Sequence, residues 1–261
     1  MLFTIFSIKI KEDKDTNMRV LITGAAGGIG QALVQEFISR GAKRVYAADL
    51  GTVLDKKAGW SKKVIPIALD VTLEDEVTSI LERCSDVNIL VNNAAIIDFS
   101  GFINSTELTK SRKLFEVNFW GYIILARAFA PILKKNGGGA IINILSEAAR
   151  ANAPFVAAYS ASKAAAWSFT QALRAECRTQ NTHVLAAFPS STDTKMIEDL
   201  EGEKEIPMEI AKGILDGLES GLEDVSVGKH SIYFEKLMRE DPKKGELEFA
   251  QFLPGDVSIP D

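Results

Sequence analysis

The sequence predicts a single α/β domain, in which a doubly wound parallel sheet of about seven strands carries helices on both faces. From Met18 onward, short runs rich in Val, Ile and Leu alternate with longer segments of helical periodicity. These runs lack the regular apolar and polar alternation of strands that face water, which indicates strands covered on both sides. No repeat, low-complexity tract or Pro/Gly-rich linker divides the pattern, so residues 18–261 are expected to form one domain.

Each element is expected at an apolar run or at a stretch of helical spacing, in chain order. The strands are expected at 19–22, 44–48, 64–69, 88–91, 140–145, 183–188 and, more weakly, 225–227. The helices are expected at 29–40, 73–83, 106–135, 157–178 and 208–220, and the third should break once before its long part. Such strand and helix alternation is typical of a parallel sheet.

Composition excludes several classes of protein. The 261 residues, 46% hydrophobic and 25% charged, have the make-up of a globular domain with one core. A net charge of −5 argues against a nucleic-acid partner, because such proteins usually present a basic face. Cys84 and Cys177 lie far apart, which fits a reducing compartment better than a disulfide framework. His183 and His230 are isolated, so no metal site is expected; one should lie in a strand and one on the surface.

Residues 1–17 differ from the rest of the chain. An apolar run, Met1–Ile10, precedes the charged stretch Lys11–Asp15, which is the reverse of a signal peptide's order. The run is also too short to cross a bilayer. We therefore expect an N-terminal extension, either an extra strand or a disordered tail, with Met18 as an alternative start. No membrane partner is expected, and the cytoplasm is the expected location.

Six expected strands end in Gly, Asp, Asn or Ser. In an open parallel sheet, ligands bind outside the carboxyl ends of the strands, so these residues should meet at one edge. One such residue would be an ordinary turn, but six in register with the sheet indicate a site. They fall at Gly24–Gly30, Asp49, Asp70, Asn92–Asn93, Ser146 and Pro189–Ser190.

The loop after the first strand has the spacing Gly-x-x-x-Gly-x-Gly, at Gly24, Gly28 and Gly30. Glycines at this place let the backbone approach a pyrophosphate at the positive end of the following helix. A plain tight turn is the alternative. Asp49 follows at the tip of the second strand, near the distance expected for an acid that binds a ribose 2′-hydroxyl. Its carboxylate would repel a 2′-phosphate, and no Lys or Arg in the glycine loop or directly after Asp49 offsets that repulsion. NAD is therefore favoured over NADP.

Tyr159 and Lys163 are four residues apart, so on a helix they share one face. A tyrosine hydroxyl titrates near pH 10, too high for ready proton exchange at neutral pH. A nearby ammonium stabilises the phenolate and lowers that pKa. Ser146, at a strand end, could hold a substrate oxygen beside Tyr159. Each residue also has an ordinary explanation, as a half-solvated helix face or as a turn.

Together these residues resemble the short-chain dehydrogenase/reductase family, from Met18 to about Gly228. The resemblance rests on Thr23–Gly24, Gly28–Ile29–Gly30, Asp70–Val71, Asn92–Asn93–Ala94, Asn118, Ser146 and Tyr159–Ser160–Ala161–Ser162–Lys163. It implies a Rossmann fold in which Tyr159 is the general acid/base and Ser146 orients the carbonyl. It also implies that Lys163 lowers the tyrosine pKa and holds the nicotinamide ribose, while Asn118 supports a water in a proton relay. Without the resemblance, Asn118 would be only a kink in a long helix.

The resemblance also assigns the remaining cofactor contacts. Asp70 and Val71 would flank the adenine, and Asn92, Asn93 and Ala94 would line the cofactor. The contacts after the sixth strand would be Pro189, Thr192 and Thr194, of which Thr194 would hold the nicotinamide carboxamide. Two positions depart from the family pattern, because Ala95 and Ser190 each stand where a glycine is usual. A side chain at Ser190 restricts the backbone where that loop must turn.

The function expected from these residues is NAD(H)-dependent hydride transfer to or from a small or medium, apolar alcohol or carbonyl substrate. Its alternative is a non-catalytic NAD-binding redox sensor or scaffold; a dehydratase or epimerase fits less well. Only a short lid, Lys195 to Ile206, follows Thr194, so the pocket should be fairly open. Candidate pocket walls are Ile96, Ile97, Phe155 and Phe188, which core packing would explain equally well. Arg150 is a candidate contact for an acidic substrate, with an ordinary surface arginine as the favoured alternative.

Oligomer contacts are expected on two segments. The stretch from Leu114 to Leu133 carries aromatic residues in several directions, which indicates burial on more than one side. Members of the family that the chain resembles usually associate through this helix and the helix that carries Tyr159. The resemblance therefore implies a homodimer or homotetramer. The segment from Tyr233 to Pro254 is expected to be a docked tail or a subunit contact.

Overall fold

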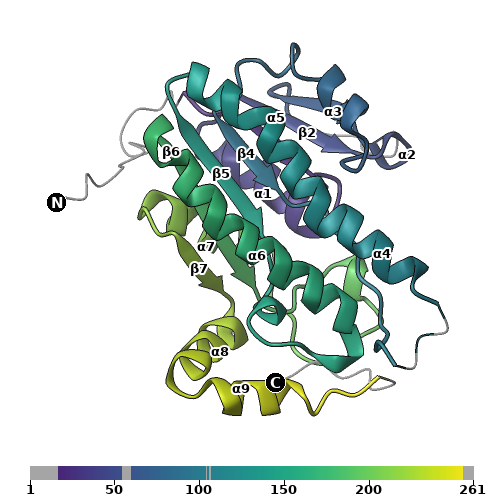
Figure 1. Cartoon of the computed structure of the whole chain (residues 1–261). Coiled ribbons are helices and arrows are strands. Elements are labelled where there is room, and N and C mark those ends of the chain that lie inside the picture. The colour runs from purple at the N-terminus through teal and green to yellow at the C-terminus, as the bar shows by residue number, and fades with distance from the viewer. Residues whose placement is uncertain (1–16, 55–59, 104, 106, 255–261) are drawn as a thin grey trace.

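The computed structural model describes residues 17–54, 60–103, 105 and 107–254, so nearly all of the expected N-terminal extension lies outside the described residues. The core of the fold is a seven-stranded sheet in the order β3-β2-β1-β4-β5-β6-β7 (Figure 1). All neighbouring pairs are parallel. The strands are β1 (Arg19–Thr23), β2 (Arg44–Asp49), β3 (Val64–Ala68), β4 (Ile89–Asn92), β5 (Gly139–Ile144), β6 (Thr182–Pro189) and β7 (Asp224–Val227).

Helices cover both faces of the sheet and enclose two apolar cores. On one face, α1 (Gly28–Ser39) and α7 (Pro207–Glu219) pack against side chains such as Val20 and Ile22. On the other, α3 (Glu74–Ser79), α5 (Gly121–Lys135) and α6 (Ala157–Cys177) pack against Leu21 and Leu90. Neighbouring residues of one strand thus enter different cores, which explains why the strands read as continuous apolar runs. The predicted doubly wound sheet is confirmed.

Most elements lie within two residues of their expected bounds, and three differ. The helix expected at 73–83 ends at Ser79 and continues as turns. The helix expected at 106–135 breaks once, as predicted, into α4 (Thr109–Phe115) and α5, joined by a π-helical turn, η1 (Glu116–Trp120). The segment expected to be a docked tail forms two helices, α8 (Lys229–Glu240) and α9 (Pro242–Phe249). Short elements complete the fold: α2 (Gly51–Leu54), η2 (Glu147–Ala149), η3 (Pro154–Val156), η4 (Arg178–Gln180) and η5 (Lys195–Ile197).

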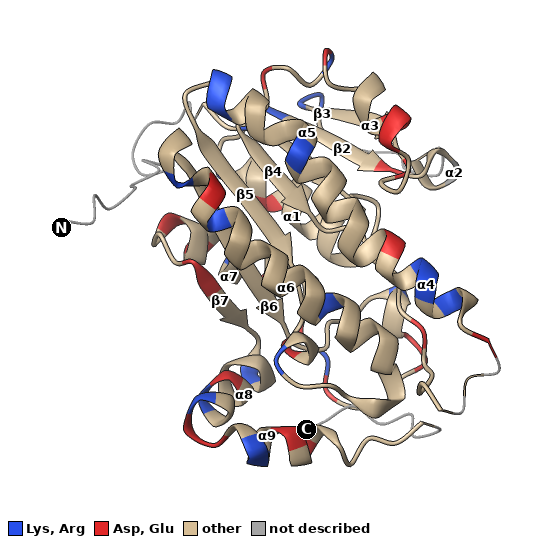
Figure 2. Ribbon diagram, viewed as in Figure 1, with Lys and Arg blue, Asp and Glu red and all other residues tan. Residues whose placement is uncertain are grey.

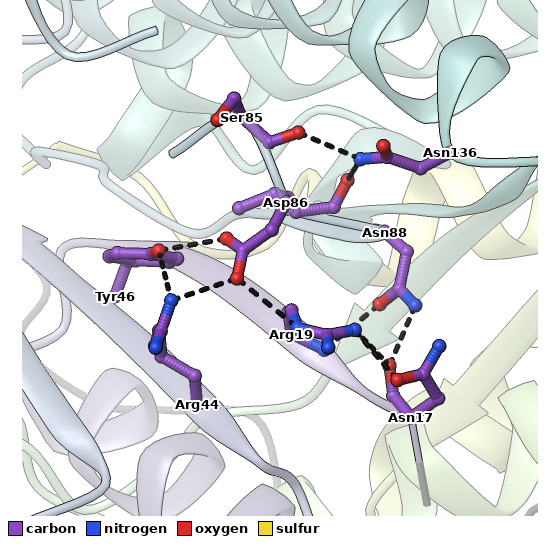
Figure 3. A network of polar contacts seen from close by, with 9 residues as sticks. Asn17, Arg19, Arg44, Tyr46, Ser85, Asp86, Asn88 and Asn136 are labelled. Carbon is purple, nitrogen blue, oxygen red and sulfur yellow. Dashed lines mark hydrogen bonds and ion pairs between the residues drawn. The ribbon is translucent and has the colours of Figure 1, made fainter. Parts of the chain in front are cut away.

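Charged residues gather on the helices and loops around the sheet, and α8 and α9 carry both signs (Figure 2). One polar network joins the amino ends of the strands, opposite to the edge where the ligand site is expected (Figure 3). In it, Asp86 accepts a hydrogen bond of 2.8 Å from the Tyr46 hydroxyl and forms ion pairs with Arg19 and Arg44. Because these residues come from β1, β2 and the turn before β4, the network ties three parts of the sheet together.

None of the helices in the described part of the chain is long and apolar enough to span a membrane. Within the same residues, no group of three or more His, Cys, Asp or Glu side chains is arranged to hold a metal ion. Both cysteines are buried and free.

Candidate active site

The glycine loop between β1 and α1 packs so closely that side chains would not fit. Gly24 has φ +62°, and a Cβ there would lie 2.8 Å from the Cα of Ala94. A Cβ on Gly30 would lie 2.1 Å from the carbonyl oxygen of Gly24. These glycines therefore leave bare backbone at the start of α1, where unpaired N–H groups and the helix dipole favour a phosphate group. The loop fits the pyrophosphate of a dinucleotide.

The loop after β6 lies against the glycine loop. A Cβ on Gly28 would come within 2.3 Å of Thr194 Cγ2, so the two loops touch at the point where α1 begins. Pro189, Thr192 and Thr194 all line the cleft between them. The Thr192 hydroxyl donates a 2.8 Å hydrogen bond to the carbonyl oxygen of Ser190, which fixes the turn.

Asp49 ends β2 at the rim of this cleft. Its Oδ2 accepts a 2.9 Å hydrogen bond from the Ala26 N–H of the glycine loop, and its Oδ1 accepts one of 2.8 Å from the N–H of Leu50. The carboxylate is half-buried and lines the cleft, as do Asp70 and Val71 at the end of β3. Asp70 is held in turn by Thr72, whose hydroxyl donates to Oδ1 at 2.7 Å.

The three residues at the end of β4 have different places. Asn93 Nδ2 donates to the carbonyl oxygens of Thr23 and Gly24, so it fastens the glycine loop, and Ala94 lines the cleft beside it. Asn92 is fully buried and donates to Asn143 Oδ1 at 2.8 Å within the sheet. It is absent from the cleft wall, so its role is to pair β4 with β5 rather than to line the cofactor cleft as expected.

A single cavity of about 930 Å³ runs from the glycine loop past the ends of the central strands. The cavity is lined by every residue expected to bind a cofactor except Asn92. Ser146, Tyr159 and Lys163 line it as well. Except for Asn92 and Asn118, the fold thus brings the expected binding and chemical residues into one cleft, from segments that lie far apart in the sequence.

Tyr159 and Lys163 share one face of α6, with the Lys163 amine 5.8 Å from the centre of the Tyr159 ring. Burial raises the pKa of Tyr159 to about 12, although a hydrogen bond with Ser146 acts in the opposite direction. Burial also lowers the pKa of Lys163 to about 7, so at neutral pH its amine is partly charged. The Tyr and Lys pair predicts a lowered pKa for Tyr159, but the residues around Tyr159 raise it.

Tyr122 on α5 completes the surroundings of the Lys163 amine. The amine donates to the Tyr122 hydroxyl at 3.1 Å and to the carbonyl oxygen of Ile144 at 2.8 Å. The Tyr122 hydroxyl donates to the same carbonyl oxygen at 2.7 Å, and the side chain is 1% exposed. Sequence reasoning had grouped Tyr122 only with the aromatic residues of its helix.

The substitution Tyr122→Phe is expected to lower the free energy of unfolding by about 1–3 kcal/mol, because it takes one of two acceptors from a buried amine. Urea denaturation measures the change. Tyr233→Phe is the matched control, since it removes a hydroxyl that meets Glu248 on the exposed side of α8. Equal stability of the two variants would contradict this role of Tyr122.

Asn118 lies in the π-helical turn η1, and its side chain is fully buried. Its Oδ1 accepts from the Ile96 N–H at 2.9 Å, while its Nδ2 donates to the Ile96 carbonyl oxygen at 2.9 Å and to Ser162 at 3.0 Å. π-Helical turns often occur at functional sites, and this one aims an amide between α6 and the loop after β4. The helix break and the expected site residue Asn118 therefore coincide.

The two departures from the family pattern have small structural effects. Among the described residues, Asn181 is the one non-glycine residue with a positive φ, so the backbone at Ser190 is unstrained. Ser190 is 7% exposed, and a Cβ on neighbouring Gly228 would lie 1.9 Å from its Oγ. The Ser190 side chain thus occupies space that Gly228 leaves. Ala95 lines the cleft.

The candidate pocket walls are confirmed in part. Ile96, Ile97 and Phe155 line the cleft, but Phe188 does not, because it is fully buried below the guanidinium of Arg150. Arg150 stacks 3.9 Å above the centre of the Phe188 ring and does not line the cleft. The suggested contact between Arg150 and an acidic substrate is therefore wrong. Sequence reasoning missed Leu200 and Phe249, which also line the cleft.

His230 was expected on the surface or in a strand and lies in neither place. It comes from α8, with a side chain 11% exposed, and its Nδ1 is 2.9 Å from Glu147 Oε2. Glu147 directly follows Ser146 and lines the cleft. Two helices thus add to the short lid expected between Lys195 and Ile206. α9 contributes Phe249 to the cleft wall, and α8 contacts Glu147 through His230.

The family model for "short chain dehydrogenase" matches residues 18–205. Among curated proteins, galactitol 2-dehydrogenase of Agrobacterium fabrum is 32% identical over 249 residues, which cover 93% of each chain. Sorbitol dehydrogenase of Cereibacter sphaeroides is 35% identical over 182 residues, 66% of this chain and 70% of that protein. The 11-beta-hydroxysteroid dehydrogenase 1A of Arabidopsis thaliana is 31% identical over 188 residues, 69% of this chain; the match spans about half of the plant protein, 53%.

Solved structures show the same fold. A short chain dehydrogenase from Burkholderia cenocepacia in complex with NADP has a TM-score of 0.85 and 30% identity, covering 91% of this chain and 99% of the other. The 3-ketoacyl-(acyl-carrier-protein) reductase of Brucella melitensis, complexed with NADH, has a TM-score of 0.73 and 26% identity, covering 83% and 99%.

Proposed function

Because the chain belongs to the short-chain dehydrogenase family, we propose that it is an NAD(H)-dependent oxidoreductase acting on a small or medium, apolar alcohol or carbonyl compound. One observation carries the proposal. Ser146, Tyr159 and Lys163 line the same cleft as the bare glycine loop at the start of α1. A dinucleotide held at that loop would lie in the cleft that also contains the acid/base tyrosine.

A bound nicotinamide cofactor supplies or accepts the hydride. The side chains of this chain supply the proton chemistry and the orientation. In carbonyl reduction, the Tyr159 hydroxyl donates its proton to the substrate oxygen; in alcohol oxidation, the phenolate accepts it. The Ser146 hydroxyl donates a hydrogen bond to the same oxygen and keeps it next to Tyr159.

Lys163 promotes the proton transfer when its amine is charged. Its nitrogen lies 5.8 Å from the centre of the Tyr159 ring, and a positive charge there stabilises the phenolate. This attraction opposes the effect of burial on the Tyr159 hydroxyl. We assign Asn118 the support of a water in the proton relay; its side-chain amide is held by Ile96 and Ser162.

The cofactor that we propose is NAD rather than NADP, on the support of the Asp49 carboxylate at the rim of the cleft. The solved relatives contain both kinds of cofactor, so the preference depends on this chain's own residues. The sensor or scaffold alternative loses its support, since the Ser190 departure causes no backbone strain.

We also propose a homodimer or homotetramer. Its support is the aromatic surface at the break between α4 and α5, where Trp120 is 47% exposed and packs edge-on against Phe119. Light scattering during gel filtration measures the assembly, and a monomer at micromolar concentration would contradict the proposal.

The experiment that tests the function is a turnover assay of the purified chain. Secondary alcohols and polyols are offered with NAD⁺, and the matching ketones with NADH, while nicotinamide absorbance is followed. The expected result is turnover of at least one alcohol and ketone pair in both directions. Binding of NADH with no turnover across the whole panel would favour the sensor or scaffold, and no binding of either nicotinamide would contradict both functions.

A further inference from the structure

An apolar wall borders the cleft on the side of Tyr159. Its residues come from the loop after β4, from the segment around η3, from η5 and its following turn, and from α9, and they form one cluster with Tyr159. Among the members that line the cleft are Ile97, Ala153, Phe155, Ile197, Leu200 and Phe249. None of these six side chains carries a charge or a hydrogen-bonding group, so the side chains of this wall offer no partner to a carboxylate or a sugar hydroxyl.

Phe249, the last residue of α9, is held firmly in this wall. Its ring stacks almost parallel on Phe234 of α8, with 4.1 Å between the ring centres and 8° between the planes. The His230 ring lies nearly parallel to the Phe249 ring, with 6.0 Å between the ring centres, and Phe249 is only 2% exposed. A ring that is packed in this way cannot swing aside without breaking the stack, so it sets a fixed limit to the cleft.

The segment that carries Phe249, here called the C-terminal cap (residues 229–254), is fastened to the catalytic loops at two places. His230 meets Glu147, the residue after Ser146, at 2.9 Å. The Phe155 N–H donates a 3.0 Å hydrogen bond to the carbonyl oxygen of Phe252. The cap lies beyond residue 205, where the match to the family model ends.

We propose that Phe249 limits the length of the apolar group that a secondary alcohol or ketone can place beside Tyr159. The proposal rests on the proposed function and deepens it. An aliphatic or aromatic substituent fills the apolar wall, and its carbinol or carbonyl oxygen reaches Tyr159 and Ser146. Polyols and hydroxy acids are disfavoured, because their polar groups would lose water against side chains that offer no hydrogen bond.

The test is a length series of 2-alkanols, from 2-butanol to 2-decanol, oxidised with NAD⁺ by the unmodified chain and by two variants of Phe249. Phe249→Ala enlarges the cleft and should move the length of highest kcat/KM to longer alkanols, with about tenfold or more gained at the long end relative to the short end. Phe249→Trp fills the cleft and should move that length the other way. Leu247→Ala, at an exposed position of the same helix, is the control with an unchanged profile.

NADH titration by fluorescence accompanies each variant, and binding should stay within about twofold of the unmodified chain. Opposite shifts for the two Phe249 variants are the result expected of a length limit, because a merely structural loss would lower all alkanols alike. The same dependence of kcat/KM on alkanol length in the unmodified chain, both Phe249 variants and Leu247→Ala would overturn the role of Phe249. Turnover of polyols such as sorbitol without turnover of any alkanol would overturn the apolar substrate class, yet would leave hydride transfer as the proposed function.

Discussion

Replacing Tyr159 by phenylalanine is expected to lower kcat by about 10²–10⁴-fold while NADH still binds. The substitution removes one hydroxyl and leaves the ring, which packs in the apolar cluster beside the cleft. Ser146 alone cannot replace the hydroxyl, since a serine is a weaker acid than a phenol. Stopped-flow or steady-state nicotinamide absorbance measures the rate, and nicotinamide fluorescence measures the binding.

The control for this variant is Tyr233→Phe, in which an exposed tyrosine of α8 loses the same atom. It should leave kcat unchanged within about twofold. If Tyr159→Phe kept more than about a tenth of the rate, the acid/base role would be wrong. If it also lost NADH binding, the hydroxyl would be needed to hold the cofactor, and the rate would no longer report on proton transfer.

NADH is expected to bind at least about tenfold more tightly than NADPH, a difference of about 1.4 kcal/mol. The reason is the Asp49 carboxylate, which two backbone N–H groups hold at the end of β2. A 2′-phosphate in the cleft would meet this charge, and neither the glycine loop nor Leu50 offers a cation. Asp49→Ser should bring the two dissociation constants within about threefold of each other, as titrations of nicotinamide fluorescence would show.

Asp75→Ser, at an exposed position in the first turn of α3, is the matched control and should keep the preference for NADH. Equal binding of the two cofactors by the unmodified chain would disprove the assignment of Asp49. The hydride-transfer function would stand in that case, because Tyr159, Lys163 and Ser146 do not contact the 2′-position in the proposed arrangement.

The sheet and the glycine loop could be predicted because their signals are local. Apolar runs such as that of β1 mark strands buried on both faces, and Gly24 and Gly30 stand where a backbone must approach another backbone. The side chains at the carboxyl ends of the strands follow from the parallel topology alone. Tyr159 and Lys163 follow from helical spacing, once a helix is expected there.

The rest of the site depends on contacts between distant segments. Tyr122 meets Lys163 only because α5, α6 and the end of β5 converge, and no spacing in the sequence records that meeting. Phe188 is explained by the sequence as either pocket wall or core, and its side chain lies in the core, under Arg150. The segment 233–254 is expected to be a tail or a subunit contact because charges outnumber apolar residues between Lys236 and Glu248. Phe234 and Phe249 are buried but lie on separate helices.

The strand order has a consequence for how the chain folds. β1 pairs with β4, although two other strands lie between them in the sequence, and each parallel pair is separated by a crossover. No hairpin can therefore form early as a local nucleus, and the entropy of closing long loops must be spent before the central pairing is gained. Such a high contact order slows folding and leaves apolar strand edges unpaired for longer. We therefore expect the protein to aggregate more readily during refolding from urea as its concentration rises.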